Sequence, residues 1–305
     1  MPLNLKHLLL FVLLFVSACA PRASVAVAPV VAGPVAAAAG FARFHLGGLE
    51  VTVLRDGGFV TPNDGGDFGS QVGPAAVGRL LRAAGAPSDR ISLSVDALLV
   101  RMPGHLVLLD TGLGPADHGV LPWSLALAGV TPDQITDVLI THDHTDHVGG
   151  LVTADGKPAF PSAVIHISAR EWPGMQKDVS TKAIAAAVAT QVKPFDPGQP
   201  LLPGVTAIPL YGHTTGHVGY EIAAAGQTLE DIGDTAHSSI VNLAEPAWRG
   251  GMDEDPAAGA ATRTHELARL AAAHELIFSP HFPWPGVGRL EAKGDGYMWK
   301  PGPSG

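Results

Sequence analysis

Six consecutive positions of this chain hold four side chains of the kinds that bind metal ions. The run is His142-Asp143-His144-Thr145-Asp146-His147, and its candidate ligands are His142, His144, Asp146 and His147. Three further candidates stand alone downstream: His213 in Gly-His-Thr-Thr-Gly-His, Asp234 in Ile-Gly-Asp-Thr, and His281 in Ser-Pro-His. Imidazole and carboxylate groups are the usual protein ligands of zinc and similar divalent ions. A dense cluster followed by three separate ligands predicts a hydrolytic centre for two metal ions.

The chemistry of such a centre accounts for the mixture of ligand types. Two divalent ions about 3.5–4 Å apart share a hydroxide that attacks the substrate. Neutral imidazoles alone would compensate the positive charge poorly, so carboxylates are expected, and we assign Asp146 and Asp234 to catalysis as well as to metal binding. The first ion is predicted on His142, His144 and His213, the second on Asp146, His147 and His281, with Asp234 bridging. We expect zinc, although manganese, iron and cobalt accept the same ligands.

The elements that must position these residues alternate along the chain. Alternating or continuous apolar runs predict strands, and apolar faces bounded by turn residues predict helices. The predicted strands are 49–54, 95–101, 106–109, 136–140, 164–168, 205–210, 220–223, 227–232 and 276–278; the helices are 74–84, a short one from 132, 182–192 and 265–273. Residues 56–58 are predicted to turn, and 59–72 to form a loop. Each candidate ligand therefore follows a strand end, where rigid scaffolds display functional loops.

The first 40 residues are predicted to lie outside the folded domain. Lys6 precedes a nine-residue apolar run, too short for a membrane span and typical of a signal peptide over 1–18. Val16-Ser17-Ala18-Cys19 is typical of a lipobox, which would make Cys19 the lipidated first residue. Cleavage after Ala20 and a cysteine without a role are the alternatives. Residues 19–40, rich in Ala, Pro and Val, are predicted to form a tether, and 41–305 the catalytic domain.

These features predict export to the periplasmic face of a bacterial envelope, or a soluble periplasmic protein if Cys19 is not lipidated. Cys19 is the one cysteine of the chain, so a disulfide within the chain is excluded. Lys6 and Arg22 are the only charged residues before position 41, and taking them from the net charge of −9 leaves −11 for the rest. No run of Lys or Arg occurs, which argues against a nucleic-acid partner.

The ligand pattern resembles that of the metallo-β-lactamase superfamily over essentially all of residues 41–305. The resemblance implies an α+β fold, a four-layer αββα sandwich, and gives the seven candidate ligands the metal-binding roles. Asp110 in Asp-Thr-Gly matches the family's buried aspartate, which would fix the ring orientation of a ligand histidine. The chain is most similar to methyl parathion hydrolase and its lactonase relatives. The motifs that carry this likeness are the Phe-x-x-x-x-Leu-Gly opening at Phe41, the strand and Asp-Gly pair at 51–57, His142 through Leu151, Ala159-Phe160-Pro161 and Phe282-Pro283-Trp284-Pro285-Gly286-Val287-Gly288.

This resemblance implies hydrolysis of a lactone or ester, with phosphotriester (organophosphate) hydrolysis as a primary or side activity. N-acyl homoserine lactone lactonases carry a tyrosine three residues after the bridging aspartate, where this chain has His237. We assign His237 to catalysis as a hydrogen-bond donor to the substrate carbonyl; an unrelated loop histidine is the alternative. His217 is interpreted as a supporting residue, and Asp143 as solvent-facing. Substrate-pocket candidates are the loop aromatics Phe68, Trp123 and Trp172.

Several other functions compete with this hypothesis. A β-lactamase would generally lack Asp234, and a glyoxalase II-like thioester hydrolase would need a basic C-terminal extension, whereas the tail has few basic residues. A mononuclear iron redox enzyme would not need seven ligands. A non-catalytic, metal-binding surface lipoprotein is the remaining alternative. The expected partners are a small-molecule substrate, a membrane reached only through the N-terminal lipid anchor and, from exposed loop aromatics, a second copy in a homodimer.

Overall fold

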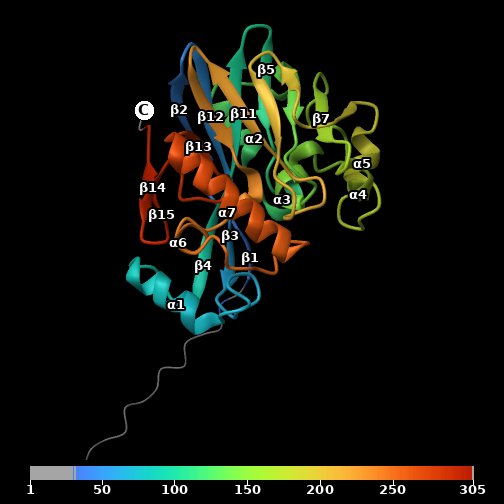
Figure 1. Ribbon diagram of the computed structural model, residues 1–305. Helices are drawn as coiled ribbons and strands as arrows, with labels where there is room; N and C mark the ends of the chain where they lie inside the picture. Colours follow the sequence, from blue (N-terminus) through green and yellow to red (C-terminus); the bar gives the residue numbers. More distant parts are fainter. Residues whose placement is uncertain (1–29, 31, 304–305) are drawn as a thin grey trace, which may run out of the picture.

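The computed structural model describes residue 30 and residues 32–303, arranged around two β-sheets (Figure 1). The predicted signal peptide, Cys19 and most of the tether therefore lie outside the described residues. The first sheet has the order β1-β3-β4-β5-β6-β7-β8, with β2 also paired to β3, and the second the order β15-β14-β13-β12-β11-β10-β9. In the described part of the chain, no helix is both long and apolar enough to span a bilayer.

The strands of the first sheet are β1 (Gly33–Val35), β2 (Phe41–Leu46), β3 (Leu49–Pro62), β4 (Arg90–Met102), β5 (His105–Leu109), β6 (Asp137–Leu139), β7 (Val164–Ser168) and β8 (Val192–Phe195). Those of the second are β9 (Pro200–Leu202), β10 (Val205–Pro209), β11 (Val218–Ala224), β12 (Gln227–Asp231), β13 (Leu276–Phe278), β14 (Val287–Lys293) and β15 (Gly296–Pro301). The helices are α1 (Pro74–Ala83), α2 (Leu121–Leu127), α3 (Thr145–Val148), α4 (Trp172–Met175), α5 (Lys182–Val188), α6 (Val241–Ala244) and α7 (Pro256–Ala273). Short 3-10 turns are Pro115–Asp117, Pro132–Gln134, Gly149–Leu151 and Gly233–Thr235.

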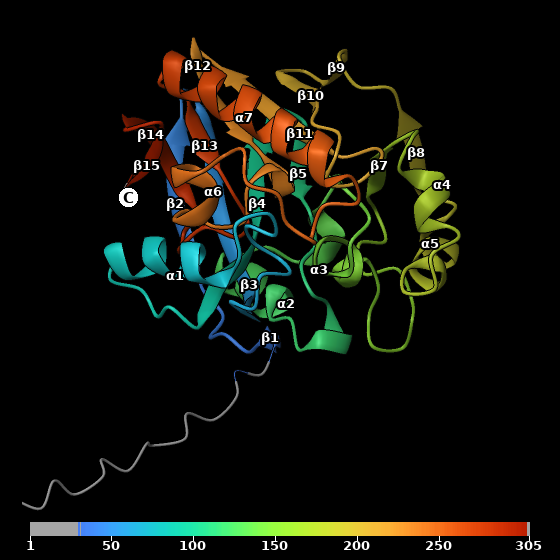
Figure 2. The same cartoon turned by 60° about the horizontal axis from the view of Figure 1, so that its bottom comes forward.

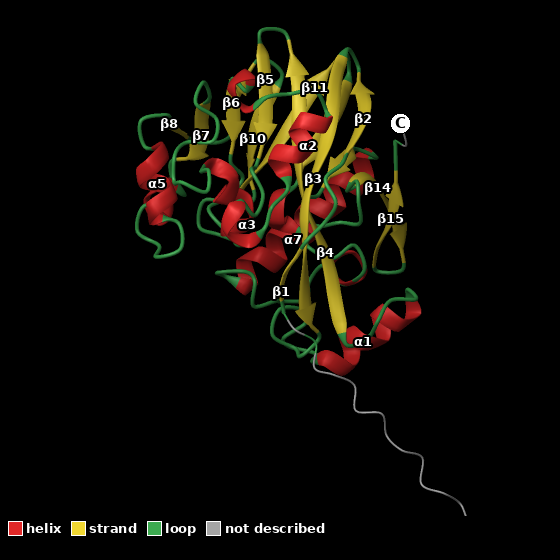
Figure 3. Cartoon of the chain, turned by 180° about the vertical axis from the view of Figure 1, so that it is seen from behind, coloured by secondary structure: helices red, strands yellow, loops and turns green. Residues whose placement is uncertain are grey.

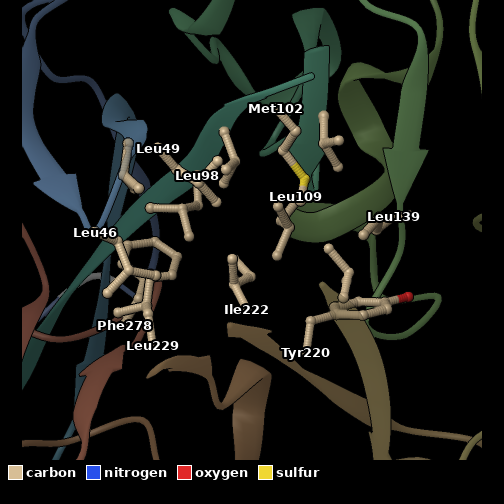
Figure 4. Packing of buried hydrophobic residues seen from close by; sticks show 14 of the residues in the cluster. Leu46, Leu49, Leu98, Met102, Leu109, Leu139, Tyr220, Ile222, Leu229 and Phe278 are labelled. Atoms are coloured by element: carbon tan, nitrogen blue, oxygen red, sulfur yellow. The ribbon is translucent and has the colours of Figure 1, made fainter. Parts of the chain in front are cut away.

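The inner faces of the two sheets form the central core (Figure 4). Leu98 and Leu109 of the first sheet face Ile222 and Phe278 of the second, all at most 1% exposed. Burying each of these side chains contributes about 1.5–3 kcal/mol, which holds the sheets together. Tyr220 on β11 donates a hydrogen bond to the carbonyl oxygen of Ile140 at 2.7 Å. The second sheet thereby fixes the backbone just before the ligand cluster.

Helices cover the outer faces of both sheets. Leu121 and Leu125 of α2, with Ala185 and Val188 of α5, join the apolar cluster outside the first sheet. Leu267 and Leu270 of α7 pack outside the second sheet, where Figure 2 shows this helix lying across the strands. Figure 3 shows α2 and α3 on the opposite side of the molecule. The predicted αββα sandwich is therefore confirmed.

Four predicted boundaries differ from the structure. The predicted helix 182–192 ends at Val188, because Val192 begins strand β8 and pairs with Ile165 of β7. Residues 56–58 do not turn: β3 runs on to Pro62 past a register shift between Arg55 and Gly57, because β1 and β4 supply backbone partners on both sides. Gly33–Val35 of the predicted tether is strand β1. Helix α7 begins at Pro256, not at 265, because Asp255 caps it by accepting from the N–H groups of Ala257 and Ala258. Its small first-turn residues give little apolar periodicity.

Candidate metal centre

All seven predicted ligands meet between the ends of the two sheets. The cluster of His142, His144, Asp146 and His147 lies on the loop after β6 and on the short helix α3. His213 follows β10, Asp234 follows β12, and His281 follows β13. Two groups of close ligand atoms result. We call them the first metal group (His142, His144 and His213) and the second metal group (Asp146, His147 and His281). A carboxylate oxygen of Asp234 lies close to all three ligand nitrogens of the first metal group.

The first metal group has the spacing that a divalent ion requires. His213 Nε2 lies 2.9 Å from His144 Nδ1 and 3.2 Å from His142 Nε2. Nitrogens bound tetrahedrally at about 2.0–2.1 Å to zinc would stand about 3.3 Å apart. The His213 nitrogen therefore already lies at nearly the distance from the other two nitrogens that one bound ion would give.

Asp234 lies between the two groups and contacts both. Its Oδ2 is 3.3 Å from His213 Nε2 and 3.6 Å from His142 Nε2. Its Oδ1 is 3.3 Å from His147 Nε2, and His281 Nε2 lies 3.0 Å from Oδ1 and 3.2 Å from Oδ2. Both Asp234 Oδ1 and His147 Nε2 are buried without a hydrogen-bond partner among the described residues. Such orphaned atoms are costly unless a ligand satisfies them, so the site fits two cations bridged by Asp234.

The aspartate of Asp-Thr-Gly holds the second metal group in place. Asp110 Oδ2 accepts from His147 Nδ1 at 2.8 Å and from the Thr141 hydroxyl at 2.8 Å, and Oδ1 accepts from the Thr141 N–H at 2.9 Å. Since Nδ1 of His147 carries the proton, Nε2 keeps its lone pair for a metal. The placement agrees with the role that the family resemblance gave to Asp110.

Two positioning residues of the first metal group were not foreseen from the sequence. Asp253 Oδ1 lies 3.1 Å from His213 Nδ1, and Arg263 contacts the other oxygen. Glu171, only 3% exposed, accepts from the Asp143 N–H at 3.0 Å and the Gly216 N–H at 2.7 Å, and so joins the two ligand loops. Asp253 and Glu171 lie far in the sequence from the candidate ligands, and neither belongs to a metal-binding motif. No local feature of the sequence therefore identified them.

Both ring nitrogens of His217 are engaged in hydrogen bonds. Its Nδ1 donates to the carbonyl oxygen of Leu210 at 2.8 Å, and its Nε2 accepts from the Asp234 N–H at 2.9 Å. Burial lowers the pKa of His217 to about 3, so the ring stays neutral and can accept this bond. His217 therefore fixes the backbone that carries the bridging aspartate.

The charges of the centre are strongly coupled. Burial would raise the pKa of Asp234, but the surrounding histidines outweigh it and hold that pKa well below its usual range. Burial would lower the pKa of His213, yet hydrogen bonds to Asp234 and Asp253 raise it to about 9. Burial and the neighbouring His213 lower the pKa of His144 to about 4. Protons on some of these rings must leave when a metal binds.

His237 is buried at the edge of the centre. Its Nε2 lies 3.1 Å from Asp234 Oδ2, and its ring stacks on that of His281 at 5.5 Å between centroids. Burial lowers the pKa of His237, so the ring is neutral near pH 7 and carries one N–H donor. Because it also forms a ligand-like group with Asp234 and His281, the structure places it where it can reach either a metal or a substrate.

A cavity of about 780 Å³ opens over both metal groups. None of the three predicted pocket aromatics lines it, so that prediction is corrected. Phe68 is buried behind His237, with an edge-on ring contact at 6.4 Å. Trp172 packs against the core outside the first sheet, and Trp123, 62% exposed, lines a separate apolar cavity. The apolar lining comes instead from four other residues: Phe59, Leu93, Leu113 and Met252.

Asp143 also differs from its prediction. It is half-buried rather than solvent-facing, and it lines the cavity beside His144. Burial and the adjacent Glu171 carboxylate raise the pKa of Asp143 to about 8.

Solved structures of similar architecture include lactonases. The structure of AidC, described as a dizinc quorum-quenching lactonase, superposes with a TM-score of 0.82 at 28% identity, over 87% of this chain and 98% of AidC. The hydrolase AbOPH gives a TM-score of 0.78 at 27% identity with the same coverage.

The curated relatives match this chain over a smaller share of their length than these solved structures do. The N-acyl homoserine lactonase AiiB of Agrobacterium fabrum is 26% identical over 55% of this chain and 72% of its own length. A human metallo-beta-lactamase domain-containing protein is 27% identical over 64% of this chain and 65% of its own length. The mouse counterpart matches over only 21% of its own length. The family model of the metallo-beta-lactamase superfamily matches residues 91–272, more than half of the chain. The αββα sandwich, the ligand geometry and this match together show that the chain belongs to the metallo-β-lactamase superfamily and is a metal-dependent hydrolase of that superfamily.

Proposed function

We propose that the protein hydrolyses carboxylic esters, including the cyclic esters called lactones, and that lactones are its preferred substrates. Phosphotriesters are the second substrate class. The observation that carries the proposal is Asp234, whose two oxygens face the two metal groups at 3.0–3.6 Å. The lactonase AidC, at 28% identity over nearly its whole length, supports a lactone. The motifs shared with methyl parathion hydrolase support the phosphotriester.

Two divalent ions bound here, zinc by our expectation, would supply the hydroxide nucleophile and polarise the substrate oxygen. The side chains of the chain itself do the positioning. Asp110, Asp253 and His217 fix the orientation of His147, His213 and Asp234. His237 is neutral, and its Nε2 lies 3.1 Å from Asp234 Oδ2. When the Asp234 oxygens hold metal ions, the N–H of His237 would donate instead to the oxygen that gains negative charge as the carbonyl carbon is attacked. Water adds across the acyl C–O bond, giving one carboxylic acid and one hydroxyl group.

The test compares four substrates on the zinc-loaded full chain by kcat/KM: an aliphatic δ-lactone, an acyl homoserine lactone, an aryl ester and methyl parathion. A lactone or ester preference that disappears in Asp234→Ala supports the proposal. Dominant turnover of methyl parathion would make phosphotriesters the primary class. Two bound metals with no turnover of any of the four would refute the proposal and favour the metal-binding, non-catalytic alternative.

The role of His237 is tested separately. His237→Phe keeps a ring in the site and removes the N–H donor, so kcat should fall about 10²–10³-fold, as when one oxyanion donor is lost. His237→Gln and His237→Tyr restore a donor and should recover part of this loss. An unchanged kcat in His237→Phe would show that His237 is only a packing residue.

Export, lipidation of Cys19 and dimerisation are proposals that rest on the sequence alone. Intact-mass analysis of the protein from a bacterial envelope should show a diacylglycerol adduct on Cys19 that is absent in Cys19→Ala. Light scattering of the purified protein decides between one and two copies. A soluble periplasmic chain without the adduct would favour simple signal-peptide cleavage.

A further inference from the structure

The cavity over the metal groups has two chemically different sides. Phe59 on β3 and Leu93 on β4 are paired across the two strands, and Leu113 lies beside them. We call these three residues the apolar wall. It adjoins the second metal group, because Ser94, next to Leu93, is hydrogen-bonded to His281 in both directions.

The opposite side carries carboxylates and adjoins the first metal group. Asp143 is next to His144 in the chain, and the N–H of Glu254 donates to the carbonyl oxygen of His213 at 2.9 Å. Asp178 completes this side, and both Asp178 and Glu254 help to raise the pKa of Asp143. We call Asp143, Asp178 and Glu254 the acidic wall.

The acidic wall has little compensating charge. Asp67 and Asp117 also line the cavity, so four carboxylates outside the metal groups face it besides the carboxyl group of Asp143, whose pKa is raised. Lys177 is the single Lys or Arg among the described residues of this lining. Asp178 and Glu254 are exposed, and their hydrogen-bond partners are neutral: Ser180 for Asp178, and Thr215 for Glu254. Lys182, which does not line the cavity, is a nearby positive charge for Asp178. Free carboxylates at the mouth of a cavity attract cations and repel anions.

The cavity holds the reacting part of any substrate, because it opens over both metal groups. Asp234 belongs to the cavity lining, and its side chain is 3% exposed. Its Oδ1 has no hydrogen-bond partner among the described residues. A volume of about 780 Å³ is of the size that holds a small-molecule substrate. The acidic wall therefore acts on whatever the metal centre processes.

We propose that this cavity selects esters and lactones that join a hydrocarbon part to an amine or quaternary ammonium group, and that it discriminates against anionic substrates. This inference rests on the proposed ester hydrolysis. The hydrocarbon part lies on the apolar wall beside the second metal group. The cationic part lies at the acidic wall beside the first metal group, so the scissile bond falls between them, over Asp234.

The test uses three butyryl esters of similar size: that of choline, that of the neutral carbon isostere of choline, and that of glycolate, which is anionic. An exposed ion pair changes affinity by a factor of about 1.5–5, so the two exposed carboxylates favour the choline ester over the isostere by up to about tenfold in kcat/KM, mainly through KM. The anionic ester should be disfavoured by a similar factor. High salt should reduce both ratios.

The variant that tests the wall is Asp178→Asn with Glu254→Gln, in which the amides keep their hydrogen bonds to Ser180 and Thr215. The choline-to-isostere ratio should fall toward one. Asp133→Asn, an exposed carboxylate outside the cavity lining, is the matched control and should keep the wild-type ratio. Calorimetry with butyltrimethylammonium, an inert cation, gives a readout that does not depend on turnover.

The outcomes separate the two proposals. Equal kcat/KM for the choline ester and its isostere, or a preference for the anion, overturns the inference and leaves ester hydrolysis standing. No hydrolysis of any ester, but cation binding that weakens in the double variant, overturns the proposed function and supports the cationic selectivity. Neither hydrolysis nor cation binding overturns both.

Discussion

Replacing Asp110 by Asn should weaken the second metal position and spare the first. The carboxylate accepts three hydrogen bonds, from Nδ1 of His147, the hydroxyl of Thr141 and the N–H of Thr141. Asn tolerates the left-handed backbone of this position, where φ is 56°, so the substitution leaves the chain path unchanged.

The amide cannot satisfy all three donors. If its oxygen keeps the Thr141 N–H, its NH₂ group faces His147, and Nδ1 must then accept. The proton of His147 moves to Nε2, the atom that should bind a metal. If the amide is reversed, its NH₂ group meets the Thr141 N–H, which leaves a buried donor unpaired and costs about 1–3 kcal/mol.

We therefore expect the affinity for the second ion to fall about 10- to 100-fold, as for other partners of ligand histidines, with the first ion changed much less. Zinc titration against a chromophoric chelator measures both affinities. The matched control is Asp137→Asn, which removes a buried carboxylate from His105 and His166 at 2.7 and 2.9 Å, away from the centre. Wild-type affinity for two ions in Asp110→Asn would refute this account, and so would an equal loss in the control.

Three further predictions concern positioning, packing and charge. Glu171→Ala loses two bonds from backbone N–H groups to a buried carboxylate, so it should lower stability by about 3–6 kcal/mol and weaken the first ion, whereas Glu171→Gln should recover part of both in denaturation and metal titration. Gly114→Ala places a Cβ 2.2 Å from the carbonyl oxygen of Gly149 at a φ of 69°; urea denaturation should show a loss of about 2 kcal/mol or more, and wild-type stability would contradict it. Burial and the neighbouring Glu266 outweigh the ion pair of Glu230 with Arg269 and raise the pKa of Glu230 from 4.5 to about 9, so the folded state holds an extra proton and stability should fall as pH rises between these values. Glu230→Gln should flatten this slope, and an unchanged slope in urea midpoints would exclude Glu230 as its source.

The candidate ligands could be found in the sequence because the chemistry is local. His142, His144, Asp146 and His147 lie within six residues, and His213, Asp234 and His281 each follow a strand end. Ligand types and strand ends are properties of short segments. Most strands could be predicted for the same reason. A short apolar run such as 276–278 indicates a buried strand without any knowledge of its neighbours in the sheet.

The errors arose where the outcome depended on distant partners. A turn at residues 56–58 was a reasonable expectation for Asp-Gly-Gly, but Asp56 accepts from the N–H groups of Leu113 and Leu121 at 2.6 Å, and neighbouring strands extend β3. Trp123 and Trp172 were placed at the pocket by their loops. Trp172 packs against the core outside the first sheet, and the exposed Trp123 lines a separate cavity.

The sequence by itself determined the superfamily, the sandwich and the set of candidate ligands, because a two-metal centre needs those residue types at strand ends. Only the tertiary structure decided that Asp234 lies between the two groups, that Asp253 and Glu171 hold the ligand loops, and that one cavity wall is acidic and the other apolar. Those properties come from side chains up to 187 residues apart that touch only after the two sheets have packed, as His281 and Ser94 do.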